Sequence, residues 1–238
     1  SPTGKRSSSS SINGTALAPA PLNHATKIFG RPVGALAAYE APPFADWWLV
    51  SWRGTGAAPG FRAVGQLLTF GVERMVQRPS HDSPHAVLPL TRHLARQCAD
   101  IARYAFVHDR WHTDDRLPVE KANELKADWT WKWIEGKADR VLGGFVAGTL
   151  GGYVAIVGKH IELIAVANEF RGIGLGTALV MAALKHGVRR VATQATNIAA
   201  QDCYRRCGLV CIKEETDYHW LSSDPGPASR AVGDSQAA

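Results

Sequence analysis

The order of the elements that the sequence predicts indicates an α+β protein with a central mixed, mostly antiparallel sheet flanked by helices. Two helical patterns over 90–134 precede three short apolar runs over 140–166, which are separated by glycine or charged turns. Helix and strand then alternate from 171 to 210. Tight turns favour an antiparallel meander, whereas a helical crossover makes the strands on either side parallel, so we expect one parallel pair near the end of the sheet.

Within a main domain that we place at 86–221, each element follows from a local pattern. In the first helix, apolar residues recur three and four positions apart, the spacing of one buried face: Leu90, Leu94, Cys98, Ile101 and Ala105. Pro118 opens a second helix that runs to about Ile134, because proline is tolerated at a first helical position. The remaining predictions are strands at 140–147, 150–157 and 161–166, a helix ending near 186, a strand at 190–194, a helix at 199–206 and a strand near 210.

Outside this domain, the sequence predicts a small N-terminal α/β lobe and two disordered ends. Aromatic and branched segments at 46–52 and 60–77, punctuated by glycine and proline, predict strands within a lobe at 27–85. Residues 1–26 hold no acidic and no aromatic residue and include a serine run, so they cannot bury enough apolar surface to offset the entropy of ordering. Residues 222–238 have a similar composition.

Composition and cysteine spacing exclude several classes of protein. The 238 residues, 45% hydrophobic and with a formal charge of +6, can bury a sizeable core and suit an anionic small-molecule ligand. The chain has no basic stripe interleaved with aromatic residues, so we predict no nucleic-acid partner. The longest uncharged stretch, Val141 to Gly158, contains six glycines and is better explained by two strands and a turn than by a membrane span. Four cysteines without zinc-site or disulfide spacing, and no apolar signal core at the start, predict a cytoplasmic protein with no metal.

The glycine-rich turn after the third strand is the strongest sign of function. Its residues, Arg171-Gly172-Ile173-Gly174-Leu175-Gly176, lie between the strand and a helix that continues through Thr177. Glycines let successive backbone N–H groups approach an anion, and a helix N-terminus adds about half a positive charge. We therefore predict that the turn binds a pyrophosphate. The alternative is a tight turn in which glycine serves packing alone.

Two well-known phosphate loops do not fit this turn. A P-loop needs Lys and then Ser or Thr after its last glycine, whereas Thr177 and Ala178 follow Gly176 here. A dinucleotide fingerprint needs Gly or Ala at 177 or at 179, where Thr and Leu stand.

The turn and a second motif together resemble the GNAT superfamily of N-acetyltransferases. Arg171, Gly174 and Gly176 match the family's acetyl-CoA loop, which reads Gln or Arg, two residues, Gly, one residue, Gly or Ala. Downstream, in NIAAQDCYRRCGL, the family's Asn and Tyr positions hold Asn197 and Tyr204. The resemblance implies the GNAT fold and acetyl-CoA as co-substrate. The residues that it implies for acetyl-CoA are Val166, Arg171, Gly172, Ile173, Gly174, Leu175, Gly176, Thr177 and Asn197.

Helical geometry supports the pairing of Asn197 with Tyr204. The two residues are seven positions apart, about two turns and on the order of 10 Å, so both line one helical face and can contact one extended ligand. Acetylation of an amine needs a proton for the leaving thiolate, and Tyr204 is our candidate for the general acid, with core packing as the alternative. A backbone N–H near Val166 would stabilise the developing oxyanion. The base is predicted at Glu162, or at His160, although Glu162 can equally point to solvent.

Within the superfamily, the chain is most similar to the dTDP-fucosamine N-acetyltransferases, over GFRAVGQLLTF (60–70), ARYAFVHDRWHTD and WTWKWIEG (within 102–136), VATQATNIAAQDCYRRCG (191–208) and DYHWL (217–221). The resemblance implies a nucleotide-linked amino deoxysugar as acceptor. It places the acceptor site on the first two helices and the loop between them, at Arg103, Tyr104, His108, Asp109, Arg110 and His112. A solvated charged loop is the alternative.

Several functional alternatives remain at this stage. The acceptor could be another amine, such as an aminoglycoside, an amino acid, a polyamine or a protein N-terminus, and the chain could also bind acyl-CoA without turnover. Trp129 and Trp133 lie on one helical face and could floor a sugar site, but we favour core packing or a homodimer contact.

Overall fold

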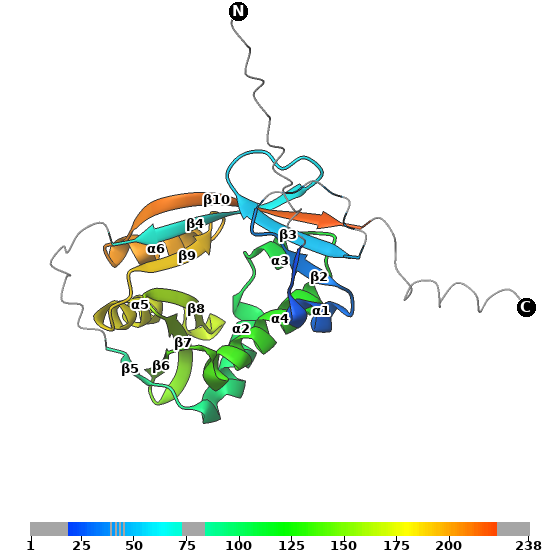
Figure 1. The fold of residues 1–238 in the computed structure, drawn as a ribbon. Coiled ribbons are helices and arrows are strands. Elements are labelled where there is room, and N and C mark those ends of the chain that lie inside the picture. Colours follow the sequence, from blue (N-terminus) through cyan, green and yellow to red (C-terminus); the bar gives the residue numbers. More distant parts are fainter. Residues whose placement is uncertain are drawn as a thin grey trace, which may run out of the picture.

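The computed structural model describes residues 19–72, apart from 39, 41, 43 and 45, and residues 84–222. Within these residues, ten strands form one sheet in the order β1-β2-β3-β10-β4-β9-β8-β7-β6-β5 (Figure 1). The strands are β1 (Ala20–Pro21), β2 (Val33–Ala35), β3 (Leu49–Gly54), β4 (Arg62–Gly71), β5 (Ala86–Pro89), β6 (Arg140–Val146), β7 (Thr149–Val157), β8 (His160–Val166), β9 (Arg190–Gln194) and β10 (Val210–Leu221). The α-helices are α1 (Asn23–Phe29), α2 (Ala95–Ala105), α3 (Arg110–Thr113), α4 (Val119–Lys132), α5 (Leu175–Lys185) and α6 (Ile198–Arg206).

The strand directions confirm the predicted mixed, mostly antiparallel sheet. β6, β7 and β8 form the expected antiparallel meander, and β8 runs parallel to β9 across the α5 crossover. A second parallel pair, β2 with β3, lies near the other edge of the sheet. The pairing of β8 with β9 covers only the first two residues of each strand, His160–Arg190 and Ile161–Val191, so the two strands separate towards their C-terminal ends.

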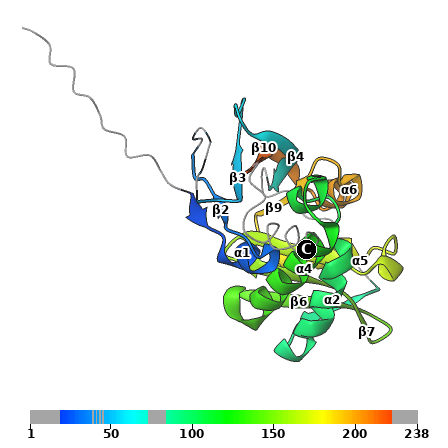
Figure 2. The ribbon, with the colours of Figure 1, turned by 90° about the vertical axis from the view of Figure 1, so that its right-hand side faces the viewer.

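Helices cover the sheet on both faces (Figures 1 and 2). On one face, α5 and the Tyr204 side of α6 pack on β4, β6 and β7 through a core that includes Phe70, Val154 and Leu179. On the other face, α2 packs on β7 and β8 with Cys98 and Tyr153 at the centre, and α4 packs beside it. Helix α5 is apolar nearly all round because both of its sides are buried.

The structure corrects the predicted N-terminal organisation. Strands β2, β3 and β4, which we assigned to a separate lobe over 27–85, belong to the same sheet as β6–β9. The reason is β10, a twelve-residue strand that pairs with β3 on one edge and β4 on the other. Residues 1–18 and 223–238 lie outside the described residues, so most of the two predicted disordered ends is not described here.

Two short elements also differ from prediction. β1 and α1 occupy part of the stretch 1–26 that we expected to be disordered, because the apolar side of α1, with Ala25, Ile28 and Phe29, is buried against α4 and β2. The strand predicted at 161–166 corresponds to β8, which ends at Val166 and is followed by a 3-10 turn at Asn168–Phe170.

Candidate active site

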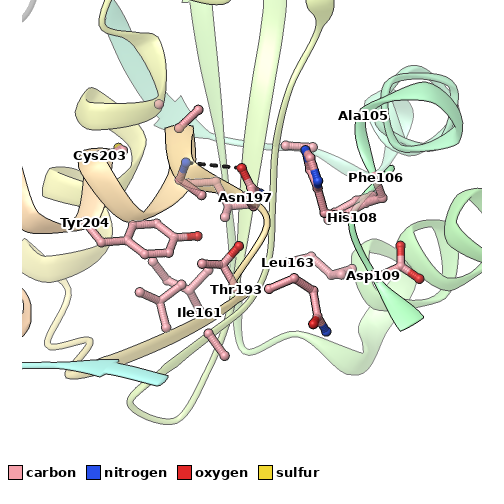
Figure 3. Close-up of a pocket in the computed structure, with 18 of the residues that line it drawn as sticks. Ala105, Phe106, His108, Asp109, Ile161, Leu163, Thr193, Asn197, Cys203 and Tyr204 are labelled. Atoms are coloured by element: carbon pink, nitrogen blue, oxygen red, sulfur yellow. Dashed lines mark hydrogen bonds between the residues drawn. The ribbon is translucent and has the colours of Figure 1, made fainter. Parts of the chain in front are cut away.

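A cavity of about 1270 Å³ opens where β8 and β9 separate. Its wall begins at the turn before α5, continues along both strands and α6, and ends among residues of α3, α4 and β3. Figure 3 shows Tyr204 and Asn197 on one side of this space, and Phe106, His108 and Asp109 on the other. The cavity therefore joins the predicted pyrophosphate turn to the predicted acceptor region.

The turn before α5 has the open backbone that an anion needs. Gly172 and Gly174 have φ values of +80° and +89°, a left-handed conformation that favours glycine. Gly174 is the N-cap of α5 and has no side chain to cap the helix, while the N–H of Ala178 already donates to the Gly174 carbonyl. The N–H groups of Leu175, Gly176 and Thr177 therefore have no partner within the helix, and they lie at its positive end beside the cavity.

The Arg171 side chain lines the cavity and is hydrogen-bonded to two other elements of the protein. Its Nε donates to the Val166 carbonyl at 3.3 Å, and its Nη2 donates to the Ala105 carbonyl at 3.2 Å. The guanidinium thus joins the end of β8 to the C-terminal end of α2, where a cation is favoured.

The end of β8 directs backbone groups into the gap. The Ala167 N–H donates to Gly151 of β7, and successive residues of an antiparallel strand alternate their N–H groups between the two sides. The Val166 N–H therefore faces away from β7, towards β9 and the cavity. Near the start of β8, Ile161 and Leu163 oppose consecutive residues of β7, so Glu162 is the extra residue of a β-bulge.

Tyr204 is buried yet lines the cavity. The side chain is 3% exposed and packs edge-on against Phe70, with 5.5 Å between ring centroids. Its hydroxyl points into the space between α6 and the loop that carries Phe106 and His108 (Figure 3). Burial, reinforced by the neighbouring Cys203 and Cys207, raises the pKa of the Tyr204 phenol above its ordinary value, so the phenol keeps its proton at neutral pH.

Asn197 and Cys203 complete the α6 wall. Asn197 is the N-cap of α6, and its Oδ1 accepts from the Ala200 N–H at 3.2 Å. Cys203 Sγ lies 3.6 Å from Thr177 Oγ1 on α5, which links the two helices.

The structure brings most of the predicted site residues to this cavity and leaves others outside it. The predicted residues that line the cavity are Tyr204, Glu162, Val166, Arg171, Gly172, Gly174, Leu175, Gly176, Thr177, Asn197, His108, Asp109 and Arg110. Ile173, Arg103, Tyr104 and His112 do not line it. Ile173 is exposed and its carbonyl contacts His85, Tyr104 is 64% exposed, and His112 is bonded to Asp109 and Asn123.

The Asp109 carboxylate lines the cavity but is bonded to other groups of the protein. Its Oδ1 accepts from the Trp111 N–H at 3.0 Å as the N-cap of α3, and its Oδ2 lies 2.7 Å from His112 Nδ1. Burial opposes its ionisation, but Lys126, His112 and the Trp111 N–H outweigh that effect and lower the pKa of Asp109 to about 2. The carboxylate is therefore charged and committed to the protein itself.

Sequence reasoning missed the residues at the far end of the cavity: Arg53 from β3, Phe106, Lys126 from α4 and Gln194 from β9. Trp129 and Trp133 also line the cavity, although we favoured core or dimer packing for them. One signal for Lys126 was present, because it lies four residues from Ala122 and four from Thr130, on the buried row of its helix.

Two features are absent from the residues that the structure describes. No helix there has the length and apolar character that crossing a bilayer requires. The same residues contain no group of three or more His, Cys, Asp or Glu side chains placed to ligate a metal.

Comparisons with known proteins agree with the fold. Residues 94–209 match the family model described as Acetyltransferase (GNAT) family, whose members use acetyl-CoA. The chain is similar in structure to a conserved protein of unknown function from Staphylococcus epidermidis, with a TM-score of 0.51 and 14% identity, over 74% of this chain and 73% of that one. No curated protein matches the sequence.

Two further solved structures are similar at 16% identity and a TM-score of 0.49. One is described as a GNAT-family acetyltransferase from Novosphingobium aromaticivorans, with 84% of this chain and 81% of that chain covered. The other is a GCN5-related N-acetyltransferase from Sphaerobacter thermophilus, with 72% and 59% covered. The chain has the GNAT fold, and the family match over 94–209, together with the glycine turn and the cavity that it borders, supports a GNAT-superfamily acetyltransferase.

Proposed function

We propose that the protein transfers an acetyl group from acetyl-CoA to a primary amine of a small molecule, with Tyr204 as the general acid. The observation that carries this proposal is the continuity of one cavity, which runs from the open N-terminus of α5, past the Tyr204 hydroxyl, to a polar pocket between α3 and α4. Acetyl-CoA would supply the activated acetyl group. Its pyrophosphate would bind the N–H groups of residues 175–177, as anions do at helix N-termini.

The protein groups beside the gap have the properties that the reaction needs. The Val166 N–H faces the gap and would donate to the acetyl oxygen as it becomes anionic, a kind of contact worth about 10² to 10³ in rate where measured. Tyr204 keeps its proton and would deliver it to the leaving sulfur. Glu162, on the bulge of β8, lines the cavity and has no hydrogen bond or ion pair with another described residue, so it is our candidate for the base that accepts the amine proton.

For the acceptor we propose a nucleotide-linked amino deoxysugar, in line with the sequence resemblance. The pocket offers both aromatic faces, at Trp129 and Trp133, and cationic side chains, which suits a sugar that carries an anionic nucleotide. An amino acid, a polyamine and an aminoglycoside are the alternative acceptors.

The test is a free-thiol release assay with acetyl-CoA and a panel of these four amine classes. In Tyr204→Phe, we expect kcat for the best acceptor to fall on the order of 10²-fold or more, while the Kd for acetyl-CoA changes less than threefold, because only the proton is lost. Because burial raises the pKa of Tyr204, the phenol stays protonated below about pH 10. The wild-type kcat should therefore not fall through deprotonation of Tyr204 in this pH range.

Tyr153→Phe is the matched control. It removes another buried phenol hydroxyl, one that bonds Thr130 and does not line the cavity, and it should leave kcat unchanged. An unaltered kcat in Tyr204→Phe would remove Tyr204 from the mechanism. Saturable acetyl-CoA binding with no thiol release for any amine would instead indicate a binding module.

A further inference from the structure

Three cationic side chains from three separate elements meet at the end of the cavity farthest from α5: Arg53 of β3, Arg110 of α3 and Lys126 of α4. We call them the cationic cluster. Among the described residues, the carboxylates within ion-pair distance of the cluster are those of Asp217 and Asp109. Glu162 also lines the cavity, but its carboxylate is not within 4 Å of any of the three cations.

Both of these carboxylates also bond groups outside the cluster. Asp217 is fully buried on β10, and one of its oxygens accepts from Arg53 Nε at 2.7 Å and from Arg110 Nη1 at 3.3 Å. Its other oxygen accepts from Gln194 Nε2 at 2.9 Å. Asp109 caps α3 and bonds His112. Lys126 Nζ lies 3.5 Å from Asp109 Oδ2, a distance longer than a normal hydrogen bond.

The cluster therefore carries a surplus of one positive charge, and two of its three cations, Arg110 and Lys126, are largely buried. Lys126 is 8% exposed, and its ammonium lies 5.1 Å from the ring centroids of both Phe106 and Trp129. Arg110 Nε is buried and has no hydrogen-bond partner in the described part of the chain. Burial lowers the pKa of Lys126 and of Arg110, since desolvation outweighs the attraction of the neighbouring carboxylates. A buried cation without a full partner is costly unless a ligand supplies the missing anion.

We propose that the cationic cluster binds an anionic group of the acceptor, a phosphate or a carboxylate, and that Lys126 and Arg110 are the residues that contact it. This inference rests on the proposed acetyl transfer to a small amine. Lys126 supplies an ammonium that lies beside two aromatic rings, and Arg110, which lines the same cavity, supplies a planar guanidinium. The apolar part of the acceptor packs on Trp129 and Trp133, which lie at the same end of the cavity.

The first experiment compares acceptors in pairs that differ only in the anionic group. One pair is an amino sugar 1-phosphate and the methyl glycoside of the same amino sugar, and the other is an amino acid and its decarboxylated amine. We expect kcat/KM to be about 10- to 100-fold higher for the anionic member, the range of a charge-assisted hydrogen bond. The pair that shows the larger ratio identifies phosphate or carboxylate, whereas ratios within twofold in both pairs would overturn the inference.

The second experiment changes the cluster itself. In Lys126→Met, we expect KM for the anionic acceptor to rise about 10- to 100-fold, with KM for its neutral counterpart and for acetyl-CoA unchanged, because only the anion contact is lost. Lys126→Arg should restore most of the affinity. Lys121→Met removes a lysine from the same helix outside the cavity and should change nothing. Equal effects of Lys126→Met on the anionic and neutral acceptors would contradict the inference.

A binding measurement separates this inference from the proposed function. With saturating CoA filling the glycine turn, inorganic pyrophosphate or citrate titrated into the protein reports on the cationic cluster alone. We expect saturable binding of at least one of the two anions in the wild type and at least tenfold weaker binding in Lys126→Met. If neither anion binds, the inference fails even where amines release CoA. If binding behaves as expected and no amine releases CoA, the acetyl-transfer proposal fails instead.

Discussion

Cys203 lies on the cavity side of α6, at the point where the acyl carrier would pass. Its Sγ is 3.6 Å from Thr177 Oγ1 and is also near the backbone of Gly176. The neighbouring Cys207, Thr177 and Arg206 lower the pKa of Cys203 against the opposing effect of burial. The lowered pKa favours the thiolate, the form that reacts with alkylating reagents.

This placement gives a footprint for the carrier. Iodoacetamide at pH 7.5 should modify Cys203 and the exposed Cys211, whereas Cys98, whose pKa burial raises to about 12, should stay unmodified. Saturating CoA should slow alkylation of Cys203 at least tenfold and leave Cys211 unchanged, as read by peptide mass spectrometry. Identical Cys203 rates with and without CoA would place the carrier elsewhere.

At this scale, the sequence could predict residues that share one short segment. Asn197 and Tyr204 were predicted to line one face because seven positions on a helix have a fixed geometry, and both line the cavity. Lys126 and Arg53 could not be found that way, because β3 and α4 are brought together only by the assembled sheet. Arg103 and Tyr104 lie on the helix that we expected, but their side chains lie outside the cavity.

Among the elements, the junction of β8, the glycine turn and α5 determines how an anion is held. Gly174 adopts φ +89° with no atom within 4 Å of an added Cβ, so the backbone conformation alone makes it glycine. Gly176 lies in the first turn of α5, where an added Cβ would be 3.8 Å from Cys203 Sγ and Val166 Cγ2, an ordinary contact at the cavity wall. The two glycines therefore serve different purposes.

Two alanine variants should separate stability from binding. Gly174→Ala should lower the free energy of unfolding by about 1–2 kcal/mol through backbone strain. Gly176→Ala should leave it equal or raise it by up to about 1 kcal/mol, because alanine favours helix. Acetyl-CoA binding should stay within about threefold of wild type, because the family loop that this turn resembles takes Gly or Ala at this position and an added Cβ meets only ordinary contacts. Urea unfolding measures the free energy of unfolding, and isothermal titration calorimetry measures the affinity for acetyl-CoA. A loss of acetyl-CoA affinity of tenfold or more in Gly176→Ala would contradict the match of this turn to the family's loop.

The longer elements between 95 and 206 were predictable because their patterns are periodic, whereas the four-residue β5 and α3 were not predicted. The first helix, the meander and β9 all agree with the strands and helices that we expected. α1, β1 and β2 are two to seven residues long, too short for periodicity to distinguish them from linker, and only their packing on α4 and β3 orders them. The bulge at Glu162 has no signature in the sequence. In a regular strand Ile161 and Leu163 would point to the same face of the sheet, but across this bulge they pack into the cores on opposite faces.

At the scale of the whole molecule, the cavity depends on one continuous sheet in which β8 and β9 separate towards their C-terminal ends. β10 holds β3 and β4 on its two edges and carries Asp217, so the N-terminal strands bring Arg53 to the same cavity as the glycine turn. Those strands are therefore part of the candidate acceptor site and not a separate lobe. The GNAT fold was predictable from its two motifs, whereas this joining of the chain's two halves was not.

The central claim is that the glycine turn and the β8–β9 gap aim an acyl carrier at Tyr204. A crystal structure of the protein with CoA tests it most directly, through the distance from the CoA sulfur to Tyr204 Oη. We expect the pyrophosphate on the N–H groups of residues 175–177 and the sulfur within about 3–4 Å of that hydroxyl, close enough for proton transfer. A CoA bound outside the gap, or a sulfur that another side chain separates from Tyr204, would contradict the account.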